Sequence, residues 1–477
     1  MSGTLYFFGC LALLVLGYAI YGVFVEKVFK IDPKRLTPVS TKADGMDYVV
    51  LPGWKIFFIQ LLNIAGLGPV FGPIVGALYG PAALLWVVFG CIFAGAVHDF
   101  IAGMISLRYG GASYPEVIGR NLGKKIRSFM EGYTILFLIL VGAVFVTGPA
   151  ALLTSMTDIP LGIWSAIIFA YYICATIMPI DVIIGRVYPF FAVLLLFMAF
   201  GLIGAMLATG MPILPHVDFQ SFAASTHPEG LPIWPGLFIV IACGAISGFH
   251  ATQSPMMARC MVNEKQGRKF FYGAMIAEGV IGLIWVTLGL SFYESPEALA
   301  AAGPAPVVVK DISISLLGSV GGVLAILGVV ILPISTGDTA FRSARMLLAD
   351  RFKMSQEKIF SRIQLALPLF VVGIALTFVD FNVIWRYFGW ANQTMACVCL
   401  WACSVYLYRR NRCHWITTLP AFFMTVVVVA FICNAPIGLN LSMTVSTIIG
   451  LIAACAVTAL FLKLGHTMPD DPEEQQA

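Results

Sequence analysis

Two long apolar segments of this chain are interrupted by glycine and proline. The first interruption reads NIAGLGPVFGP, from Asn63 to Pro73, and the second reads CGAISGFHATQSP, from Cys243 to Pro255. Each lies in a stretch long enough to cross a bilayer, and four other such stretches separate them. Unwound backbone at membrane depth is tolerated only where it lines a wet cavity or a ligand site, because its amide and carbonyl groups are unpaired. The matched pair therefore predicts a transporter-like binding site near the membrane centre.

Most of the chain is expected to face lipid. Its 477 residues are 60% apolar and only 11% charged, whereas a soluble domain carries roughly 25% charged residues. Runs of about 20 apolar residues mark membrane-spanning helices, so we predict an all-α integral membrane protein with about thirteen of them. The expected spans are residues 4–24, 54–79, 82–106, 129–153, 161–180, 187–208, 233–257, 270–293, 313–342, 363–381, 384–408, 415–434 and 441–463.

Lysine and arginine orient these spans. With the N-terminus outside, all 28 basic residues except Lys310 and Arg386 fall at or near cytoplasmic ends, which is the positive-inside asymmetry. We therefore predict an outside N-terminus and a cytoplasmic C-terminus. Residues 1–25 have no basic n-region or cleavage site, so we expect a retained helix rather than a signal peptide. The eleven cysteines form no CxxC pair and are expected to pack among apolar residues.

The order of the spans contains an internal symmetry. Spans two to six begin inside with an interrupted helix, and spans seven to eleven begin outside with another, which is a five-plus-five inverted repeat. The predicted division is residues 1–50 for the first helix and a cytoplasmic loop, 51–208 for the first repeat, 209–408 for an external loop and the inverted repeat, and 409–477 for two further helices and an acidic tail.

The two interruptions are predicted to form one substrate site. We expect Pro73 to open the outer half-helix, Ser254 to cap the inner half-helix and Pro255 to occupy its first turn. The positive ends of both half-helix dipoles would then face one volume that favours a carboxylate. Ordinary glycine and proline kinks are the alternative. The residues assigned to substrate are Asn63, Gly66, Gly68, Gly72, Gly248, His250, Thr252, Gln253 and Ser254.

A coupling ion, H+ or Na+, is expected beside the first interruption. In inverted-repeat transporters the eighth core helix supplies hydroxyls to a sodium ion, and Ser335 and Thr336 hold that place; the alternative is that they bond to the preceding helical turn. Ionisable groups inside spans are also candidates. The residues assigned to the ion are Ala65, Ser335, Thr336, His98, Asp99 and Glu278.

For several polar groups a purely structural role is an alternative to binding substrate or ion. His98 and Asp99 are at least as well explained as a hydrogen-bonded pair, and Asp338 with Arg342 as a structural i,i+4 pair. Asn392, Gln393 and Thr394 are candidates for bonds between helices only. A metal site built from His98, Asp99 and His250 has too few ligands, so neither a metal nor any other cofactor is expected.

Three stretches resemble the carbon-starvation protein family of bacterial membrane transporters. They are DGMDYVVLPGWKIFFIQLLNIAGLGPVFGPIVGALYGP, LLWVVFGCIFAGAVHDFIAGMISLRYGGASYPEVIG and SGFHATQSPMMAR. The resemblance is dense from about Thr37 to Gly123 and recurs near Ser247 and Ser335. It implies inner-membrane import of peptides or pyruvate, coupled to an ion gradient and used when carbon is scarce. It also implies kinship with the amino acid–polyamine–organocation superfamily and its LeuT-like fold.

Two other classes of protein are weighed against the symporter. An intramembrane enzyme is disfavoured because the sequence contains no HExxH or GxSxG motif, and it has no GxxxxGK[ST] nucleotide loop. A channel is disfavoured because channels usually assemble a filter from repeated subunits. The expected partners are a small-molecule substrate and the lipid bilayer. No basic stripe suits nucleic acid, and homo-oligomerisation stays open.

Overall fold

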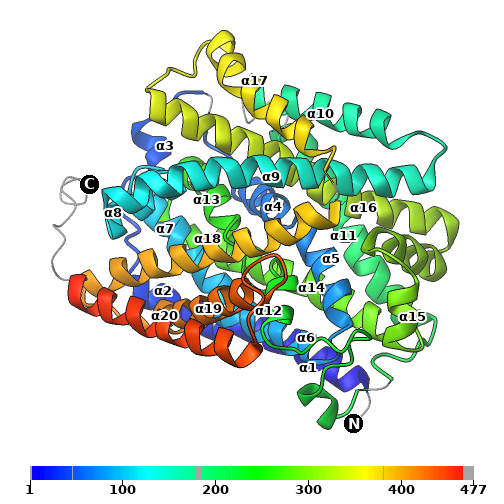
Figure 1. Ribbon diagram of the computed structural model, residues 1–477. Helices are drawn as coiled ribbons and strands as arrows, with labels where there is room; N and C mark the ends of the chain where they lie inside the picture. Colours follow the sequence, from blue (N-terminus) through cyan, green and yellow to red (C-terminus); the bar gives the residue numbers. More distant parts are fainter. Residues whose placement is uncertain (1–2, 46, 179–183, 216, 380, 466–477) are drawn as a thin grey trace.

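Long uncharged runs of Leu, Ile, Val, Phe and Ala fold here into helices, because a helix pairs its own backbone groups without water. The computed structural model describes residues 3–45, 47–178, 184–215, 217–379 and 381–465, and within these ranges every regular element is helical (Figure 1). The acidic tail expected from Asp470 lies outside the described residues. By length and composition, nine helices in these ranges can cross a membrane, or ten if one bent pair counts as a span.

Within the described residues, each of the thirteen predicted spans overlaps a helix or consecutive helical pieces, but only nine or ten of them are long and apolar enough to cross a membrane. The first span is α1 (Gly3–Leu16), η1 (Gly17–Tyr21) and α2 (Gly22–Phe29). The first set of five contains α4 (Gly53–Ile64) with α5 (Gly68–Ala77); α6 (Ala82–Leu85), η2 (Trp86–Gly95) and α7 (Ala96–Arg108); α9 (Lys124–Met156); α10 (Leu161–Ile177); and α11 (Ile184–Ala208).

The second set of five spans has the same order of helices as the first, beginning with a broken helix. It contains α12 (Gly236–Val240) with α13 (His250–Cys260); η5 (Arg268–Tyr272) and α14 (Gly273–Ser291); α16 (Ala305–Phe352); α17 (Ile359–Leu376); and α18 (Phe381–Arg409). The last two spans are α19 (Trp415–Asn434) and α20 (Met443–Leu464). Short helices in the connections are α3 (Pro38–Thr41), α8 (Tyr114–Leu122), η3 (Gln220–Ala223), η4 (Glu264–Gln266) and α15 (Pro296–Ala301).

The contacts between helices repeat in the order that an inverted repeat requires. The half-helix α5 packs on α14, and its counterpart α13 packs on α7. In the same way α11 packs on α16 and α18 packs on α9, while α9 and α16, the third members of the two sets, pack on each other. Each of these contacts in one set thus has an equivalent contact between the matching helices of the other set. The broken helices α4, α5, α12 and α13 lie near the middle of the ribbon diagram (Figure 1).

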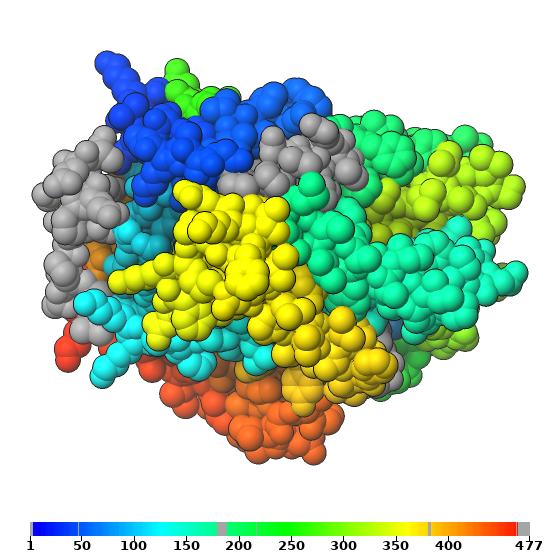
Figure 2. Space-filling model, turned by 90° about the horizontal axis from the view of Figure 1, so that it is seen from above, coloured from blue at the N-terminus to red at the C-terminus, as the bar shows by residue number. Residues whose placement is uncertain are grey.

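The outer helices turn large apolar side chains away from the protein. Phe200 of α11, Phe360 of α17 and Ile452 of α20 are all exposed, as expected of surfaces that meet hydrocarbon rather than water. Figure 2 shows α10 and α17 side by side on one face, and α19 and α20 lie toward the opposite side in Figure 1. The polar groups of the interruptions are thereby kept away from lipid.

Candidate substrate and ion site

The first break separates α4, which ends at Ile64, from α5, which begins at Gly68. Ala65 leaves helical geometry with φ −79° and ψ 68°, and the two half-helices are bent by 46°. Gly66 lies directly against the ring of Phe145, where an added Cβ would be 2.5 Å from a ring atom. The glycines thus let α4 unwind against its neighbours, and the first predicted break is confirmed.

The second break separates α12, which ends at Val240, from α13, which begins at His250. Gly244 has φ +88°, a conformation that residues with a side chain rarely adopt. Asn392 of α18 holds this segment, because its Oδ1 accepts hydrogen bonds from Phe249 N at 2.8 Å and from Ser247 Oγ at 3.1 Å. The second predicted break is also confirmed, and Asn392 bonds between helices as expected.

The two breaks lie against each other. An added Cβ at Gly68 would lie 2.1 Å from Cys243 Cβ, and one at Gly72 would lie 2.9 Å from the Val240 carbonyl oxygen. On the other side, a Cβ at Gly244 would lie 3.6 Å from Pro69 Cα. Backbone therefore approaches backbone at the place where both helices unwind. This contact joins segments from the two repeats, as the sequence predicted.

The half-helices begin earlier than the sequence suggested. Pro73 lies inside α5, whose first turn contains Pro69 instead, and Pro255 lies inside α13. The predicted capping role of Ser254 is wrong, since its Oγ donates to the His250 carbonyl oxygen at 3.0 Å within the helix. Proline suits the first turn, but membrane helices also tolerate it further along where neighbouring groups satisfy the backbone. The prolines therefore indicated which segments are broken, but they did not indicate the residue at which each half-helix begins.

Some of the predicted substrate residues lie at the contact between the breaks or line a pocket, and others face neighbouring helices. Gly68 and Gly72 lie at the contact between the breaks, and Thr252 lines a small pocket beside α13 of ≈ 20 Å³, which is room for about one water. Gly248 faces α18 instead, because an added Cβ would lie 2.4 Å from Ala396 N. The ring of His250 points to Asp99 and Glu278.

Several buried amide atoms near the breaks have no hydrogen-bond partner among the described residues. Both amide atoms of Asn63 are unpaired at the end of α4, and so is Oε1 of Gln253 in α13. The same holds for Oε1 of Gln60, whose Nε2 donates to Ser254 Oγ at 3.4 Å. An unsatisfied buried group costs about 1–3 kcal/mol, so such groups are typical of a site that a polar ligand or water completes.

Ser335 and Thr336 touch the first break. Their hydroxyls donate to the Leu62 carbonyl oxygen at 2.9 and 3.1 Å, and they also bond to the Leu332 carbonyl one turn earlier. The two sequence-based alternatives, contact with the break and bonding to the preceding turn, are therefore combined in one geometry. The two hydroxyls and the Leu62 carbonyl form a compact corner of oxygen atoms, the ligand type that small hard cations prefer, and Ala65 is buried at the end of α4, the helix of Leu62.

Four titratable residues from three different spans, His98, Asp99, His250 and Glu278, form one buried chain. Asp99 lies between two imidazoles, with Oδ1 at 2.8 Å from His98 Nδ1 and Oδ2 at 2.9 Å from His250 Nδ1. Nε2 of His250 in turn lies 3.3 Å from Glu278 Oε2. Glu278 reaches the second break, since its Oε1 accepts from Gly244 N at 3.1 Å. The expected His98–Asp99 pair is present, and Asp99 extends it to α13.

The predicted pair of Asp338 with Arg342 is wrong. Asp338 accepts hydrogen bonds from the hydroxyls of Tyr171 at 2.7 Å and Tyr188 at 3.0 Å. Arg342 instead lies 3.3 Å from Asp47 in the loop before α4. One helical turn allows an i,i+4 contact, but here partners from α10, α11 and the loop compete for both groups. Spacing along one helix could not reveal those partners.

Asp47 joins the loop before α4 to α16. Its Oδ1 lies 3.3 Å from Arg342 Nη1, and its Oδ2 lies 3.7 Å from Arg345 Nη2. Burial opposes ionisation of this carboxyl, but the guanidiniums of Arg342, Arg345 and Arg259 outweigh it and lower the pKa of Asp47. The carboxylate is thus held charged by Arg259 of α13 and by Arg342 and Arg345 of α16, the helix that also carries Ser335 and Thr336.

Replacing Asp47 by Asn is expected to destabilise the protein by about 3–5 kcal/mol, because it leaves buried guanidiniums without their carboxylate. The folded-state pKa of Asp47 lies below its unfolded value, so the stabilisation is present above the unfolded pKa and is lost as the pH falls through the folded pKa. Thermal unfolding in detergent at several pH values measures both effects. A variant as stable as wild type at neutral pH would contradict this role.

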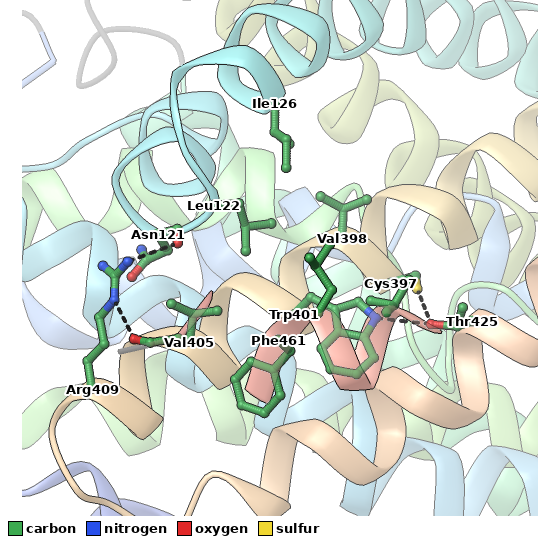
Figure 3. A pocket seen from close by; sticks show the side chains of 13 residues that line it. Asn121, Leu122, Ile126, Cys397, Val398, Trp401, Val405, Arg409, Thr425 and Phe461 are labelled. Carbon is green, nitrogen blue, oxygen red and sulfur yellow. Dashed lines mark hydrogen bonds between the residues drawn. The ribbon is translucent and has the colours of Figure 1, made fainter. Parts of the chain in front are cut away.

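A second cavity lies away from the breaks. It has a volume of ≈ 340 Å³ and lies between the end of α8 and helices α18, α19 and α20. Trp401 and Cys397 both contact Thr425 Oγ1 in its wall, at 3.0 and 3.1 Å, and Arg409 lies at one end (Figure 3). The wall is otherwise mostly apolar, so the polar site at the breaks would not be found by cavity size.

Two opposed broken helices that meet inside an all-helical membrane protein define the fold of LeuT-like secondary transporters. The sequence profile of the carbon starvation protein CstA family matches residues 2–162, 149–312 and 290–430. The chain belongs to this family.

Several curated proteins are similar to this chain in sequence, and a solved structure is similar in fold. An uncharacterized membrane protein of Haemophilus influenzae is 46% identical over 62% of this chain and 94% of its own length. The peptide transporter CstA of Bacillus subtilis is 27% identical over 81% and 82%, and the pyruvate/proton symporter BtsT of Escherichia coli is 27% identical over 57% and 46%. The nucleobase-cation-symport-1 transporter Mhp1 has the same fold, with a TM-score of 0.57 at 16% identity over 90% and 96%.

Proposed function

We propose that this protein is a secondary active symporter that imports small peptides or pyruvate-like carboxylates. The observation that carries the proposal is the direct contact between the two breaks, with Gly68 against Cys243 and Gly72 against Val240. Each break starts a half-helix, so both positive helix ends lie beside the same contact. The names of the relatives, a peptide transporter and a pyruvate/proton symporter, support both substrate classes.

The unpaired amides are the proposed contacts to the polar end of the substrate. A substrate carboxylate would accept hydrogen bonds at the start of α5 and from Asn63 Nδ2, which is buried without a partner in the described chain. Oxygen acceptors at Asn63 and Gln253 suit a solute that also carries N–H or O–H groups. Uphill import then requires that the contact between the breaks open to one side at a time.

The coupling ion is proposed to be Na+ or H+. A sodium ion would take the corner made by the Leu62 carbonyl and the hydroxyls of Ser335 and Thr336. A proton fits the name of the Escherichia coli relative, and buried Asp338, held by two tyrosine hydroxyls, is an acceptor close to that corner along α16. The assignment of His98, Asp99 and Glu278 to the ion stays a prediction.

The cellular setting is part of the same proposal. A multi-pass protein with bacterial transporter relatives fits the bacterial inner membrane, with the N-terminus outside and the C-terminus in the cytoplasm. The driving force is the ion gradient, so no resident cofactor is needed. An intramembrane enzyme or a channel is the alternative, and a homo-oligomer is compatible with all of these functions.

Uptake into proteoliposomes tests the proposal. We expect pyruvate, or a di- or tripeptide, to accumulate above its external concentration when a pH or sodium gradient is imposed, and to leak out when a protonophore or sodium ionophore collapses that gradient. Flux that only equilibrates the substrate would indicate a channel. Cleavage of the peptide without accumulation would indicate an enzyme.

The same assay with Ser335→Ala and Thr336→Ala, singly and together, identifies the ion. If sodium drives uptake, the double variant should require at least about tenfold more sodium, since losing 1.4 kcal/mol changes an affinity tenfold. Thr339 is the matched control, because its hydroxyl bonds only to the Ser335 and Thr336 carbonyls in the described structure, and Thr339→Ala should leave the sodium requirement unchanged. Sodium-independent uptake that follows the pH gradient would assign the proton instead.

A further inference from the structure

We infer that a divalent d-block ion of the zinc class binds in the second break, between Cys243, His250 and Glu278. One ligand atom from each residue lies within 4.8 Å of the other two, and all three side chains are buried. Cys243 and His250 come from the two ends of the unwound segment, and Glu278 comes from α14. The inference goes beyond the proposed transport function and does not depend on it.

Two of these atoms lack a hydrogen-bond partner. Nε2 of His250 and Oε2 of Glu278 are fully buried and face each other at 3.3 Å, which is an ion pair only when His250 is protonated, and neither atom has a hydrogen-bond partner within the described chain. Leaving such groups unsatisfied costs about 1–3 kcal/mol each. A metal ion between them would use both lone pairs at once, and the Cys243 sulfur belongs to the same group of ligand atoms, which all lie within 4.8 Å of one another.

Each ligand is oriented by a second bond, as metal ligands usually are. His250 Nδ1 is held by Asp99 Oδ2 at 2.9 Å, which leaves Nε2 as the ligating nitrogen. The other oxygen of Glu278 accepts from Gly244 N at 3.1 Å. The Cys243 sulfur contacts Ser247 Oγ at 3.4 Å and Asn392 Nδ2 at 3.7 Å. Asp99 and His250 therefore already form the carboxylate–histidine part of a carboxylate–histidine–metal arrangement.

The set of ligand atoms selects the metal. Sulfur with nitrogen and oxygen suits Zn²⁺ or Co²⁺ and not Mg²⁺ or Ca²⁺, which prefer oxygen alone. Three protein ligands leave a fourth tetrahedral position for water or another small ligand. Zinc bonds of about 2.0–2.3 Å place tetrahedral ligands roughly 3.3–3.8 Å apart. His250 Nε2 and Glu278 Oε2 already have this spacing at 3.3 Å, so the Cys243 sulfur must approach them by about 1 Å at most, since all three ligand atoms lie within 4.8 Å of one another. One thiolate and one carboxylate balance the two positive charges, and binding releases the thiol proton.

A bound ion would tie both ends of the second break to α14. Cys243 also backs onto Gly68, where no Cβ fits, so the ion would hold the two breaks in contact with each other. We therefore expect metal binding to stabilise this arrangement and the unfolding temperature to rise with the free metal concentration.

Cobalt titration of the untagged, full-length protein in detergent tests the site. Co²⁺ should bind one per chain and produce both tetrahedral visible bands and a thiolate-to-cobalt charge-transfer band, and Zn²⁺ should remove these bands by competition. Cys243→Ser should lose the charge-transfer band and bind at least tenfold more weakly, and Glu278→Gln should also bind more weakly. Cys433→Ser is the matched control, since that buried cysteine lies in α19, and it should bind like wild type.

Two results would overturn the inference. Wild-type protein that binds cobalt without a thiolate band would do so through other histidines, such as His227 or His414. Equal loss of the band in Cys243→Ser and Cys433→Ser would show that the sulfur ligand is not specific to the break. Because the first result needs only the wild-type protein, the inference stays testable even if a variant fails to fold. Uptake is not part of the readout, so failure here would leave the transport proposal untouched.

Discussion

Gly68→Val should abolish uptake while the protein still reaches the membrane. An added Cβ at Gly68 would lie 2.1 Å from Cys243 Cβ and 2.4 Å from its sulfur, and Val adds two further methyl groups. Because this position is where the two breaks touch, the excess volume must be taken up by moving one break against the other. Overpacking of this kind costs about 1–3 kcal/mol and displaces the breaks from each other, so we expect initial uptake to fall to the level of protein-free liposomes.

Gly132→Val is the control for this experiment. Gly132 is also a glycine inside a membrane helix, in α9, but an added Cβ there meets nothing within 4 Å. It should retain uptake close to wild type when both variants are reconstituted in equal amounts. Normal uptake by Gly68→Val would mean that the contact between the breaks is not part of the transport path, and it would remove the main support for the proposed function.

The existence of both breaks could be predicted, but their boundaries could not. Glycine and proline at matched places in two apolar spans indicate unwound helices rather than ordinary kinks, and the inverted repeat follows from them with the positions of the basic residues. Pro73 and Pro255 gave the wrong starting points because proline is acceptable both in a first turn and further along a packed membrane helix. Gly68 and His250 carry no signal that distinguishes the first residue of a half-helix from its neighbours.

The pairing of the polar groups was the part least accessible to sequence. Asp338 and Arg342 have the spacing of an ion pair, yet Arg342 binds Asp47, which lies 295 positions away in the chain. Cys243 was expected only to pack, since cysteine in an apolar span is usually a small apolar residue. Its closeness to His250 and Glu278 depends on how the second break folds back on α14. The correct part of the prediction was local, and the missed part required three-dimensional contacts.

Asp99→Ala should be the most destabilising of the single substitutions in the buried chain of titratable residues. The carboxylate of Asp99 binds Nδ1 of both His98 and His250, at 2.8 and 2.9 Å, and all three side chains are fully buried. Removing it leaves two imidazole N–H groups without their acceptor, at about 1–3 kcal/mol each. We therefore expect a loss of roughly 2–6 kcal/mol, visible as a lower unfolding temperature in detergent and a smaller yield of folded protein.

Asp99→Asn separates the loss of hydrogen bonds from the loss of side-chain volume. The amide oxygen can still accept from one imidazole, and the other imidazole can accept from the amide N–H if it adopts its other neutral tautomer. The Asn variant should accordingly lose less than half as much stability as the Ala variant. Asp311→Ala, an exposed carboxylate on α16, serves as the control and should change stability by less than about 0.5 kcal/mol. Equal stabilities for Asp99→Ala and Asp311→Ala would contradict the view that Asp99 connects α7 to the second break through the two imidazoles.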